Sequence, residues 1–165
     1  MSENREREIL ELLEADARHT THDLAAMLNM ETSIVEELIR ELEHRGVILG
    51  YRTLVNWNKI GVEKVTALIE VKVTPQRDVG FDAVAERIAR FPEVKTMRLM
   101  SGTYDLAVEV EGATMQEVAF FVATRLAPIE GVVSTTTHFV LKSYKEDGIL
   151  INTKEEPAAR LVVSP

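Results

Sequence analysis

The apolar residues near the N-terminus recur with a helical period, and they predict three short helices in quick succession. Within the charged segment 5–16, an isoleucine and two leucines stand at positions i, i+1 and i+4, which makes an amphipathic stripe. A second apolar segment begins after Thr20 and Asp23, whose spacing is that of a capping box. A third stripe over 34–42 follows the spacing i, i+1, i+4, i+5 and i+8, and Gly46 is a natural end for that helix.

From residue 47 the pattern becomes typical of extended chain. The segment 47–55 is rich in β-branched and aromatic residues, which predicts a strand. The segment 56–61 carries two asparagines, a tryptophan and a final glycine, and it predicts a linker. The helical period and the pattern that follows therefore belong to different parts of the protein.

Beyond the linker, strand-like and helix-like patterns alternate. Residues 65–73 place apolar side chains at every second position, as a half-buried strand does. The remaining predicted elements are a helix over 81–88, strands over 94–100 and 106–110 joined by a turn at 101–105, a helix over 115–126 and a strand over 132–141. The order βαββαβ predicts a ferredoxin-like domain, in which two helices cover one face of a four-stranded antiparallel sheet.

The other face of the predicted sheet has no cover within this domain. Leu68, Met97 and Leu99, or their neighbours, are expected to be exposed there. An uncovered apolar face predicts that two copies of the chain associate, so a homodimer is expected and a monomer is not.

The chain is therefore predicted to be an α+β protein, and 165 residues suffice for two small domains. A short strand is also predicted within 142–151. The predicted divisions are 1–50 for an N-terminal helix-turn-helix (winged-helix-like) domain, 51–61 for a strand and linker, 62–141 for the ferredoxin-like βαββαβ domain, and 142–165 for a C-terminal tail.

Composition narrows the chemistry. The 27 acidic residues outnumber 19 basic ones, and the net charge of −8 counts against a protein that coats nucleic acid by bulk charge. The absence of cysteine excludes disulfides and thiolate metal sites. The apolar runs are far shorter than the roughly 20 residues of a membrane helix. The charged N-terminus has no signal-peptide core. A cytoplasmic protein with no membrane partner is therefore expected.

No metal, cofactor or catalytic residue is predicted. His19 and His22 are three residues apart but straddle a predicted helix start, and the other two histidines, His44 and His138, are distant in sequence. The chain contains no phosphate-binding glycine loop, no nucleophile elbow and no zinc-protease motif.

Two motifs resemble those of a known family. The string from Leu42 to Tyr51, Leu-Glu-His-Arg-Gly-Val-Ile-Leu-Gly-Tyr, follows the third predicted helix, and Gly-Thr-Tyr-Asp stands at 102–105. In both motifs and their order, the chain resembles the Lrp/AsnC (feast/famine) transcription regulators. The resemblance implies a protein that binds double-stranded DNA and dimerises through its sensing domain, with tetramers or octamers as further assemblies. It also implies a small effector, usually an amino acid, at a junction between dimers.

In a helix-turn-helix the second helix lies in the major groove, and here that helix is expected at about 32–45. Its apolar stripe faces the core, so its polar residues face outward. Ser33 and Glu36 also have the spacing of a capping box. The candidate DNA-binding residues on the helix are Ser33, Glu36, Glu37, Arg40 and His44. The plausible phosphate anchors are Arg18, Arg40, Arg45, Arg52 and Lys59.

The expected DNA-binding surface is acidic. Residues 31–46 hold five glutamates and two arginines, and residues 1–61 hold 12 acidic and seven basic residues. Phosphate contacts supply much of the affinity for DNA, so acidic residues weaken it, although a glutamate can accept a hydrogen bond from cytosine N4. Two hypotheses follow. One is a DNA-binding regulator, and the other is an Lrp-like oligomeric ligand-binding protein whose DNA binding is weak or lost.

The candidate effector site centres on the predicted turn at 101–105. The resemblance implies that backbone groups of this turn hold the amino and carboxylate ends of the effector, although the same residues are typical of an ordinary tight turn. Hydroxyls on the last strand and a methionine side chain are candidate walls of the pocket. The candidate effector-binding residues are Met100, Gly102, Thr103, Tyr104, Asp105, Thr135, Thr136 and Thr137.

An enzyme with the same architecture is the remaining alternative. Sirohaem decarboxylases also join a helix-turn-helix-like domain to a βαββαβ unit, and they would need histidines and an aromatic-rich motif around the pocket. The segment 102–108 has no histidine, and aromatic residues make up 5% of the chain. A tetrapyrrole site is usually richer in aromatic residues, so we predict a regulator and not an enzyme.

Overall fold

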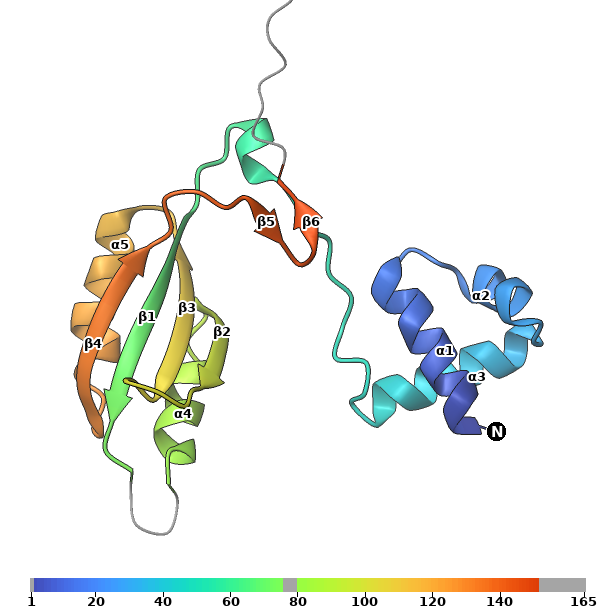
Figure 1. Ribbon diagram of the computed structural model, residues 1–165, viewed down its shortest axis with the longest axis horizontal. Coiled ribbons are helices and arrows are strands. Elements are labelled where there is room, and N and C mark those ends of the chain that lie inside the picture. The colour runs from blue at the N-terminus through green and yellow to red at the C-terminus, as the bar shows by residue number, and fades with distance from the viewer. Residues whose placement is uncertain (1, 76–79, 152–165) are drawn as a thin grey trace, which may run out of the picture. The chain divides into compact units, whose positions relative to one another are not determined.

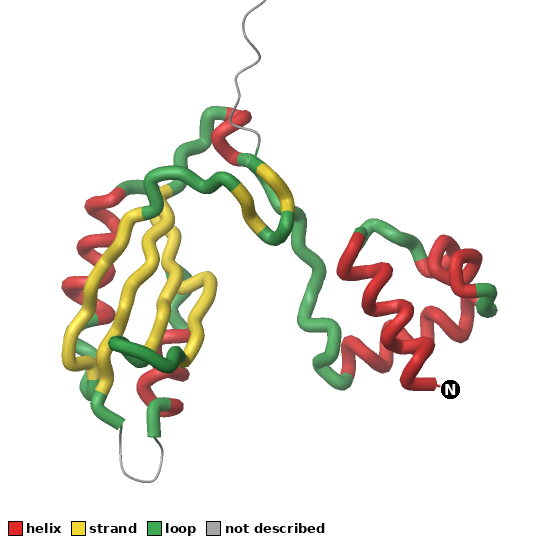
Figure 2. The backbone as a smooth tube through the Cα atoms, in the orientation of Figure 1, coloured by secondary structure: helices red, strands yellow, loops and turns green. Residues whose placement is uncertain are grey.

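The computed structural model describes residues 2–75 and 80–151, and it divides into two compact units. The first unit spans residues 1–55 and the second spans residues 56–165. The described part of the first unit is helical, whereas the second is built around a β-sheet (Figure 1, Figure 2).

Residues 2–55 contain the three predicted helices. These are α1 (Ser2–Ala15), α2 (Thr21–Leu28) and α3 (Thr32–His44). Their apolar faces meet in one core, in which Ile9, Leu24 and Val35 are fully buried. Burying one such side chain contributes about 1.5–3 kcal/mol. Helices this short are marginal alone, so the shared core is what stabilises them.

Helix α2 is fixed at both of its ends. The predicted capping box starts α2, since Thr20 Oγ1 accepts a hydrogen bond from the Asp23 N–H at 3.1 Å and the Asp23 carboxylate accepts one from the Thr20 N–H at 3.0 Å. Asn29 ends α2 in the left-handed region with φ of 51°. The chain therefore reverses within a few residues, as a helix-turn-helix requires.

The capping box predicted at Ser33 and Glu36 is wrong. The N-cap of α3 is Glu31, which makes no side-chain hydrogen bond to the helix end. Ser33 already lies in the first turn, and Glu36 Oε1 instead accepts a hydrogen bond from the Thr21 hydroxyl at 3.4 Å. The physical reason is the short α2–α3 turn, which makes the helix begin before Ser33.

The strand predicted over 47–55 is absent from the structure. Gly46, with φ of 67°, ends α3, and the next two backbone N–H groups both donate to the Leu42 carbonyl. The described residues between α3 and the sheet contain only one short 3-10 helix, Trp57–Ile60. A strand needs a neighbour to complete its hydrogen bonds, and no described segment of this chain pairs with 47–55, so a β-forming composition alone is not sufficient.

The second unit has the predicted βαββαβ order. Its elements are β1 (Val65–Val73), α4 (Asp82–Ala89), β2 (Val94–Leu99), β3 (Leu106–Gly112), α5 (Met115–Phe121), a π-helical continuation of α5 (Val122–Leu126), and β4 (Val132–Phe139). The strands lie in the order β2-β3-β1-β4, and each neighbouring pair is antiparallel. Residues of both helices pack into one core with the same sheet face, so the fold is the predicted ferredoxin-like one (Figure 1).

Alternation along β1 builds this core. Ala67, Ile69 and Val71 are fully buried, as are Ile88 of α4 and Leu126 beyond α5. The two edges of the sheet, β2 and β4, have no further strand beside them in the described structure.

A β-bulge in β2 overturns one prediction. The register with β3 shifts within 94–96, and the extra residue reverses which face the following side chains occupy. Met97 therefore lies opposite Val108 and packs against the core, and Leu99 lies on the same helix-covered face, 59% exposed near the edge. The expectation that both lie on the open face is wrong, and only Leu68 is found there.

The open face of the sheet is mainly polar among the described residues. Glu70 Oε1 of β1 lies 3.4 Å from His138 Nε2 of β4. Glu109 of β3 and His138 flank Leu68 from either side. An assembly that uses this face must therefore accommodate charged groups beside the leucine.

The segment 142–151 forms a hairpin instead of the predicted short strand. Strands β5 (Lys145–Glu146) and β6 (Ile149–Leu150) pair across Asp147 and Gly148, which both have positive φ, as an Asp-Gly hairpin turn requires. The rest of the predicted tail, 152–165, lies outside the described residues. No described helix is long and apolar enough to cross a membrane.

Candidate functional site

The exposed side of α3 is the candidate DNA interface. Val35 and Leu42 are the buried residues of this helix. Successive residues are rotated by about 100°, which places four exposed side chains opposite the buried side. We call this set the outer stripe, and it consists of Ser33, Glu37, Arg40 and His44. Four of the five predicted helix contacts therefore share one line, while Glu36 lies to the side, toward α2.

Two of the predicted phosphate anchors are already paired with carboxylates. Arg18 Nη2 lies 2.9 Å from Asp16, an interaction that holds the pKa of that carboxyl well below its usual range. Arg45 Nη2 lies 3.1 Å from Glu6 of α1, and its Nη1 lies 3.5 Å from Glu41. The hydrogen bond that Arg45 donates to Glu6 raises the pKa of Arg45. Both arginines must therefore exchange a carboxylate for a phosphate in order to contact DNA.

Arg40 and Arg52 are the unpaired arginines among the predicted anchors. Neither forms an ion pair with any residue that the structure describes, and both are exposed. Arg40 belongs to the outer stripe, and Arg52 follows α3 in the connecting segment. These two guanidinium groups are free to meet phosphates without breaking an existing contact.

The candidate effector site is the turn Met100–Asp105, which joins β2 to β3. The Met100 N–H donates to the Asp105 carbonyl at 2.8 Å, which closes the turn. The Asp105 N–H donates to the Val71 carbonyl at 3.1 Å, and Asp105 Oδ2 accepts from the Val73 N–H at 2.9 Å. Asp105 therefore ties the turn to the end of β1, whatever else it does.

The backbone N–H groups inside this turn are unused. Those of Ser101, Gly102, Thr103 and Tyr104 donate to no residue in the described ranges. The first three residues are exposed, and Tyr104 is half-buried. Consecutive free N–H groups in a turn bind anions such as carboxylates. Ser101 was not among the predicted contacts, although its position inside the turn was a sufficient signal.

The three threonines of β4 are divided between the two sheet faces. Thr135 and Thr137 face the helices and are half-buried, whereas Thr136 is exposed on the open face. Thr135 lies opposite Val71, the residue whose carbonyl accepts the Asp105 N–H. Only one strand therefore separates Thr135 from the turn. Met100, at the start of the turn, is 39% exposed.

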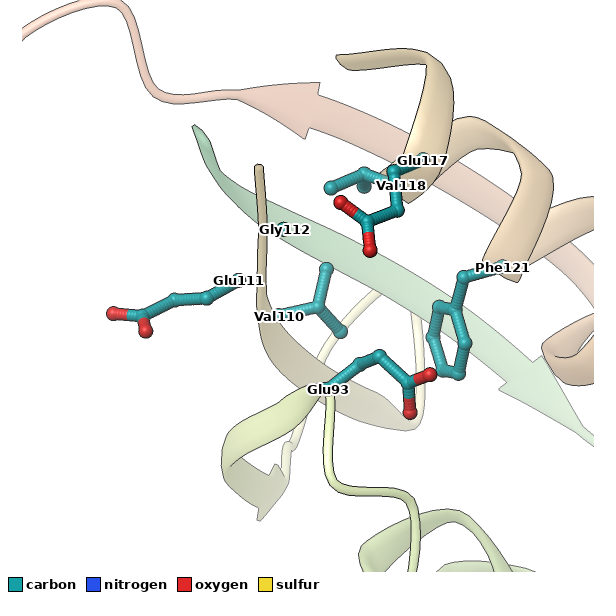
Figure 3. Close-up of a pocket in the computed structure, with 7 residues that line it drawn as sticks. All are labelled: Glu93, Val110, Glu111, Gly112, Glu117, Val118 and Phe121. Carbon is teal, nitrogen blue, oxygen red and sulfur yellow. The ribbon is translucent and has the colours of Figure 1, made fainter. Parts of the chain in front are cut away.

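A small pocket lies between β3 and α5 (Figure 3). Its lining residues are Glu93, Val110, Glu111, Gly112, Glu117, Val118 and Phe121. The carboxylates of Glu93 and Glu117 point toward one another across the pocket, while that of Glu111 points away (Figure 3). None of these residues was predicted to belong to a site.

The two inward carboxylates of this pocket have structural partners. Glu117 Oε2 accepts from the Ala113 N–H at 2.7 Å at the start of α5. Glu93 Oε1 pairs with Arg125, whose guanidinium lies 4.5 Å from the centre of the Phe91 ring. Glu93 Oε2 is buried without a hydrogen-bond partner in the described structure. Across the described ranges, no group of three or more histidine and acidic side chains is arranged to hold a metal ion.

Comparison with known proteins agrees with both units. A model of the Lrp/AsnC ligand binding domain matches residues 66–150, and a model of winged helix-turn-helix DNA-binding domains matches residues 3–48. The chain belongs to the Lrp/AsnC family. It is thus a DNA-binding transcriptional regulator with a ligand-binding domain, as the resemblance implied.

Similar proteins are regulators over their whole length. The uncharacterised HTH-type regulator YugG of Bacillus subtilis is 48% identical over 162 residues, which is 98% of this chain and 97% of YugG. The proline dehydrogenase transcriptional activator of Rhizobium radiobacter is 26% identical over 141 residues, 86% of this chain and 90% of the activator. The enzymatic alternative has no support among these relatives.

Solved structures share the fold. The Mycobacterium tuberculosis leucine response regulatory protein aligns with a TM-score of 0.73 at 24% identity, covering 87% of this chain and 94% of that one. The Neisseria meningitidis regulator NMB0573, solved as a complex with L-Met, aligns with a TM-score of 0.69 at 23% identity, covering 89% and 94%. Both support the arrangement of elements within each unit.

Proposed function

We propose that this Lrp/AsnC regulator binds operator DNA as a homodimer or a larger assembly, and that a small amino-acid effector modulates its assembly or its DNA binding. The proposed DNA contacts are the outer stripe, Glu36 and the anchor Arg52. The predicted anchors Arg18 and Arg45 are held by carboxylates, and we do not propose them as phosphate contacts. The proposed effector contacts are Met100, the turn residues 101–105 and the threonines of β4.

The free N–H groups of the turn Met100–Asp105 are the observation that carries the effector proposal. An amino acid presents a carboxylate and an ammonium group a few ångströms apart, so its site needs a cluster of donors beside an acceptor. The unused N–H groups of residues 101–104 supply the donors. Asp105 uses Oδ2 to hold Val73, and its Oδ1 has no partner among the described residues, so that oxygen is available for the ammonium.

Exposed apolar side chains support assembly of the second unit. Leu99 is 59% exposed and Val133 is 65% exposed, on opposite edge strands of the sheet, and Leu141 just beyond β4 is 88% exposed. Side chains of this size stabilise a protein when they are covered. A second copy of the chain would cover them. An effector bound near such an interface acts through its different affinity for the assembled states.

Titration calorimetry with a panel of amino acids tests the effector site. Gly102→Ala is the informative variant, because a Cβ at Gly102 meets no atom within 4 Å, and the backbone strain of alanine at its φ of 158° is matched in the control below. The substitution changes the backbone and the bulk of the turn that carries the free N–H groups, so we expect the affinity for the effector to fall about tenfold or more, which is 1.4 kcal/mol.

Gly50→Ala is the matched control. Gly50 has a φ of 154° against 158° for Gly102, and a Cβ there also meets nothing within 4 Å. Calorimetry should give wild-type affinity for this variant. If no amino acid binds the wild type, or if both variants bind equally well, the turn is not the effector site.

Light scattering coupled to chromatography tests assembly, and a gel shift with a fragment of the protein's own promoter tests DNA binding. We expect a dimer or larger species that shifts the fragment in a salt-sensitive way. A protein that assembles and binds an amino acid but shifts no fragment at low salt, with or without that amino acid, would be the ligand-binding protein without DNA binding. A monomer indifferent to amino acids would contradict the sensing proposal.

A further inference from the structure

The acidic residues of α3 fall into two groups. Three of the carboxylates are bonded to neighbouring side chains. Glu36 accepts a hydrogen bond from the Thr21 hydroxyl at 3.4 Å, and Glu43 accepts one from the Tyr51 hydroxyl at 3.0 Å. Glu41 forms an ion pair with Arg45 Nη1 at 3.5 Å. Glu37 makes no hydrogen bond or ion pair with any described residue, and it is exposed. It is also the acid of the outer stripe. Among the four glutamates of α3, Glu37 is thus the unbonded carboxylate, and it faces directly away from the core, while Glu31 precedes the helix at its N-cap.

The position of Glu37 along the helix suits a contact to a base. In a helix-turn-helix the N-terminal residues of the second helix reach the base edges in the major groove. Glu37 is in the N-terminal half of α3, one turn after Ser33 and one turn before Arg40. Arg40 is unpaired, so its charge can offset the repulsion between phosphates and the Glu37 carboxylate. These three side chains form a continuous row on the outer stripe.

The chemistry of a carboxylate then selects the base. An ionised glutamate only accepts hydrogen bonds. In the major groove guanine offers N7 and O6 acceptors, thymine offers an O4 acceptor and a methyl group, and adenine places its N7 acceptor beside its N6 donor. Cytosine alone presents the N4 donor without a neighbouring acceptor on its own edge. A carboxylate in the groove is therefore repelled or poorly matched by three bases and accepted by one.

We propose that Glu37 is a specificity-determining residue, which accepts a hydrogen bond from N4 of a cytosine in each half-site. The inference rests on the proposed DNA binding of this chain. The Glu37 carboxylate lowers the affinity of α3 for DNA phosphates, and the same group disfavours bases other than cytosine. The acidity of α3 therefore contributes to the sequence specificity of binding.

Selection from a random DNA library tests this with the full chain. The wild type should enrich sites with a fixed cytosine in each half, and replacing that base pair should weaken binding at least about fivefold. In Glu37→Gln the preference at that position should move to adenine, because glutamine pairs with adenine N6 and N7. Other positions of the site should keep their preference.

Glu14→Gln is the matched control. Glu14 lies near the end of α1, is exposed, and loses the same single charge when substituted. This variant should bind somewhat more tightly with an unchanged base preference. Thermal unfolding of both variants at the wild-type temperature confirms that their folds are intact.

Two outcomes would overturn the inference, and they are distinguishable. If the wild type selects a defined site but Glu37→Gln selects the same bases, Glu37 does not read the sequence and DNA binding stands. If the wild type enriches no sequence at low salt with or without effector, both the inference and the proposed DNA binding fail.

Discussion

The dependence of DNA binding on salt should be unusually shallow for this regulator. Each phosphate that a cationic side chain contacts releases counterions, and log K falls with log salt by about 0.9 per contact. The first unit contributes six arginines, of which four are paired with acids and two, Arg40 and Arg52, are unpaired in the described structure. The number of contacts is therefore set by pairing within the protein rather than by the count of arginines.

The salt dependence differs widely according to whether only the unpaired arginines or all six arginines contact phosphates. If only the unpaired arginines of each subunit contact phosphates, a dimer makes about four contacts and the slope is about −3.6. Binding then weakens by roughly 150-fold between 50 and 200 mM salt. If all six arginines of each subunit were engaged, the slope would be about −11 and the loss would exceed about a millionfold.

Fluorescence anisotropy with a labelled operator over this salt range measures the slope. Arg52→Gln should make it shallower by about 1.8 for a dimer, because one contact per subunit is lost. Arg18→Gln is the control and should leave the slope unchanged, since Arg18 is held by Asp16 at 2.9 Å. A wild-type slope steeper than about −6, or an equal effect of both substitutions, would refute the reasoning from pairing.

Three further outcomes concern stability. Thr20→Ala removes the N-cap of α2 and should lower the free energy of unfolding of the first unit by about 1 kcal/mol in urea titrations followed by circular dichroism. Asp105→Ala leaves the part-buried Val73 N–H without its acceptor, and about 1–3 kcal/mol should be lost from the second unit in the same assay. The hydrogen bond from Thr20 lowers the pKa of Asp23. The contribution of ionised Asp23 to the free energy of unfolding is therefore full above the unfolded pKa of about 3.9, and it disappears as pH falls through the lower folded pKa. Asp23→Asn should therefore flatten the acid limb of a stability–pH curve, and an unchanged limb would contradict this.

Most of the fold could be predicted from the sequence because both units depend on regular apolar periods. The apolar spacing over 34–42 can be buried on one side only of a helix, and the alternation over 65–73 can be buried on one face only of a strand. These patterns also order the elements, and βαββαβ has a well-known three-dimensional solution. Local signals of this kind are complete within a few residues, which is why they were sufficient here.

Two wrong predictions, the face of β2 and the strand over 47–55, have a common cause. Both depend on pairing between strands, which the pattern within one segment does not show. The bulge in 94–96 adds one residue to β2, and that insertion moves Met97 and Leu99 from the open face to the helix-covered face. No residue type in that segment marks the position. The strand predicted over 47–55 was wrong for a related reason. A strand forms only beside a second strand, and the composition of one segment does not show whether such a neighbour exists.

The candidate sites were predictable in position but not in bonding. The outer stripe follows from the helical period, so four of its residues were expected correctly to face outward. Which carboxylates and guanidiniums are already bonded depends on contacts between helices, such as Glu6 with Arg45 across 39 positions of sequence. Similarly, Asp105 was expected at the effector turn, whereas its bond to Val73 became evident only in the folded sheet.

Pairing changes what the acidity of the first unit means for a regulator. Non-specific affinity for DNA comes almost entirely from cations on phosphates, whereas specific affinity adds contacts to bases. A DNA-binding unit with two unpaired arginines and an outward glutamate has a non-specific affinity that is lowered more than its specific affinity. Because the rest of the genome competes for a regulator through non-specific binding, the ratio of the two determines occupancy of the operator. A net charge of −5 over residues 1–61 is therefore compatible with a selective regulator, and it favours one that discriminates by bases over one that binds tightly everywhere.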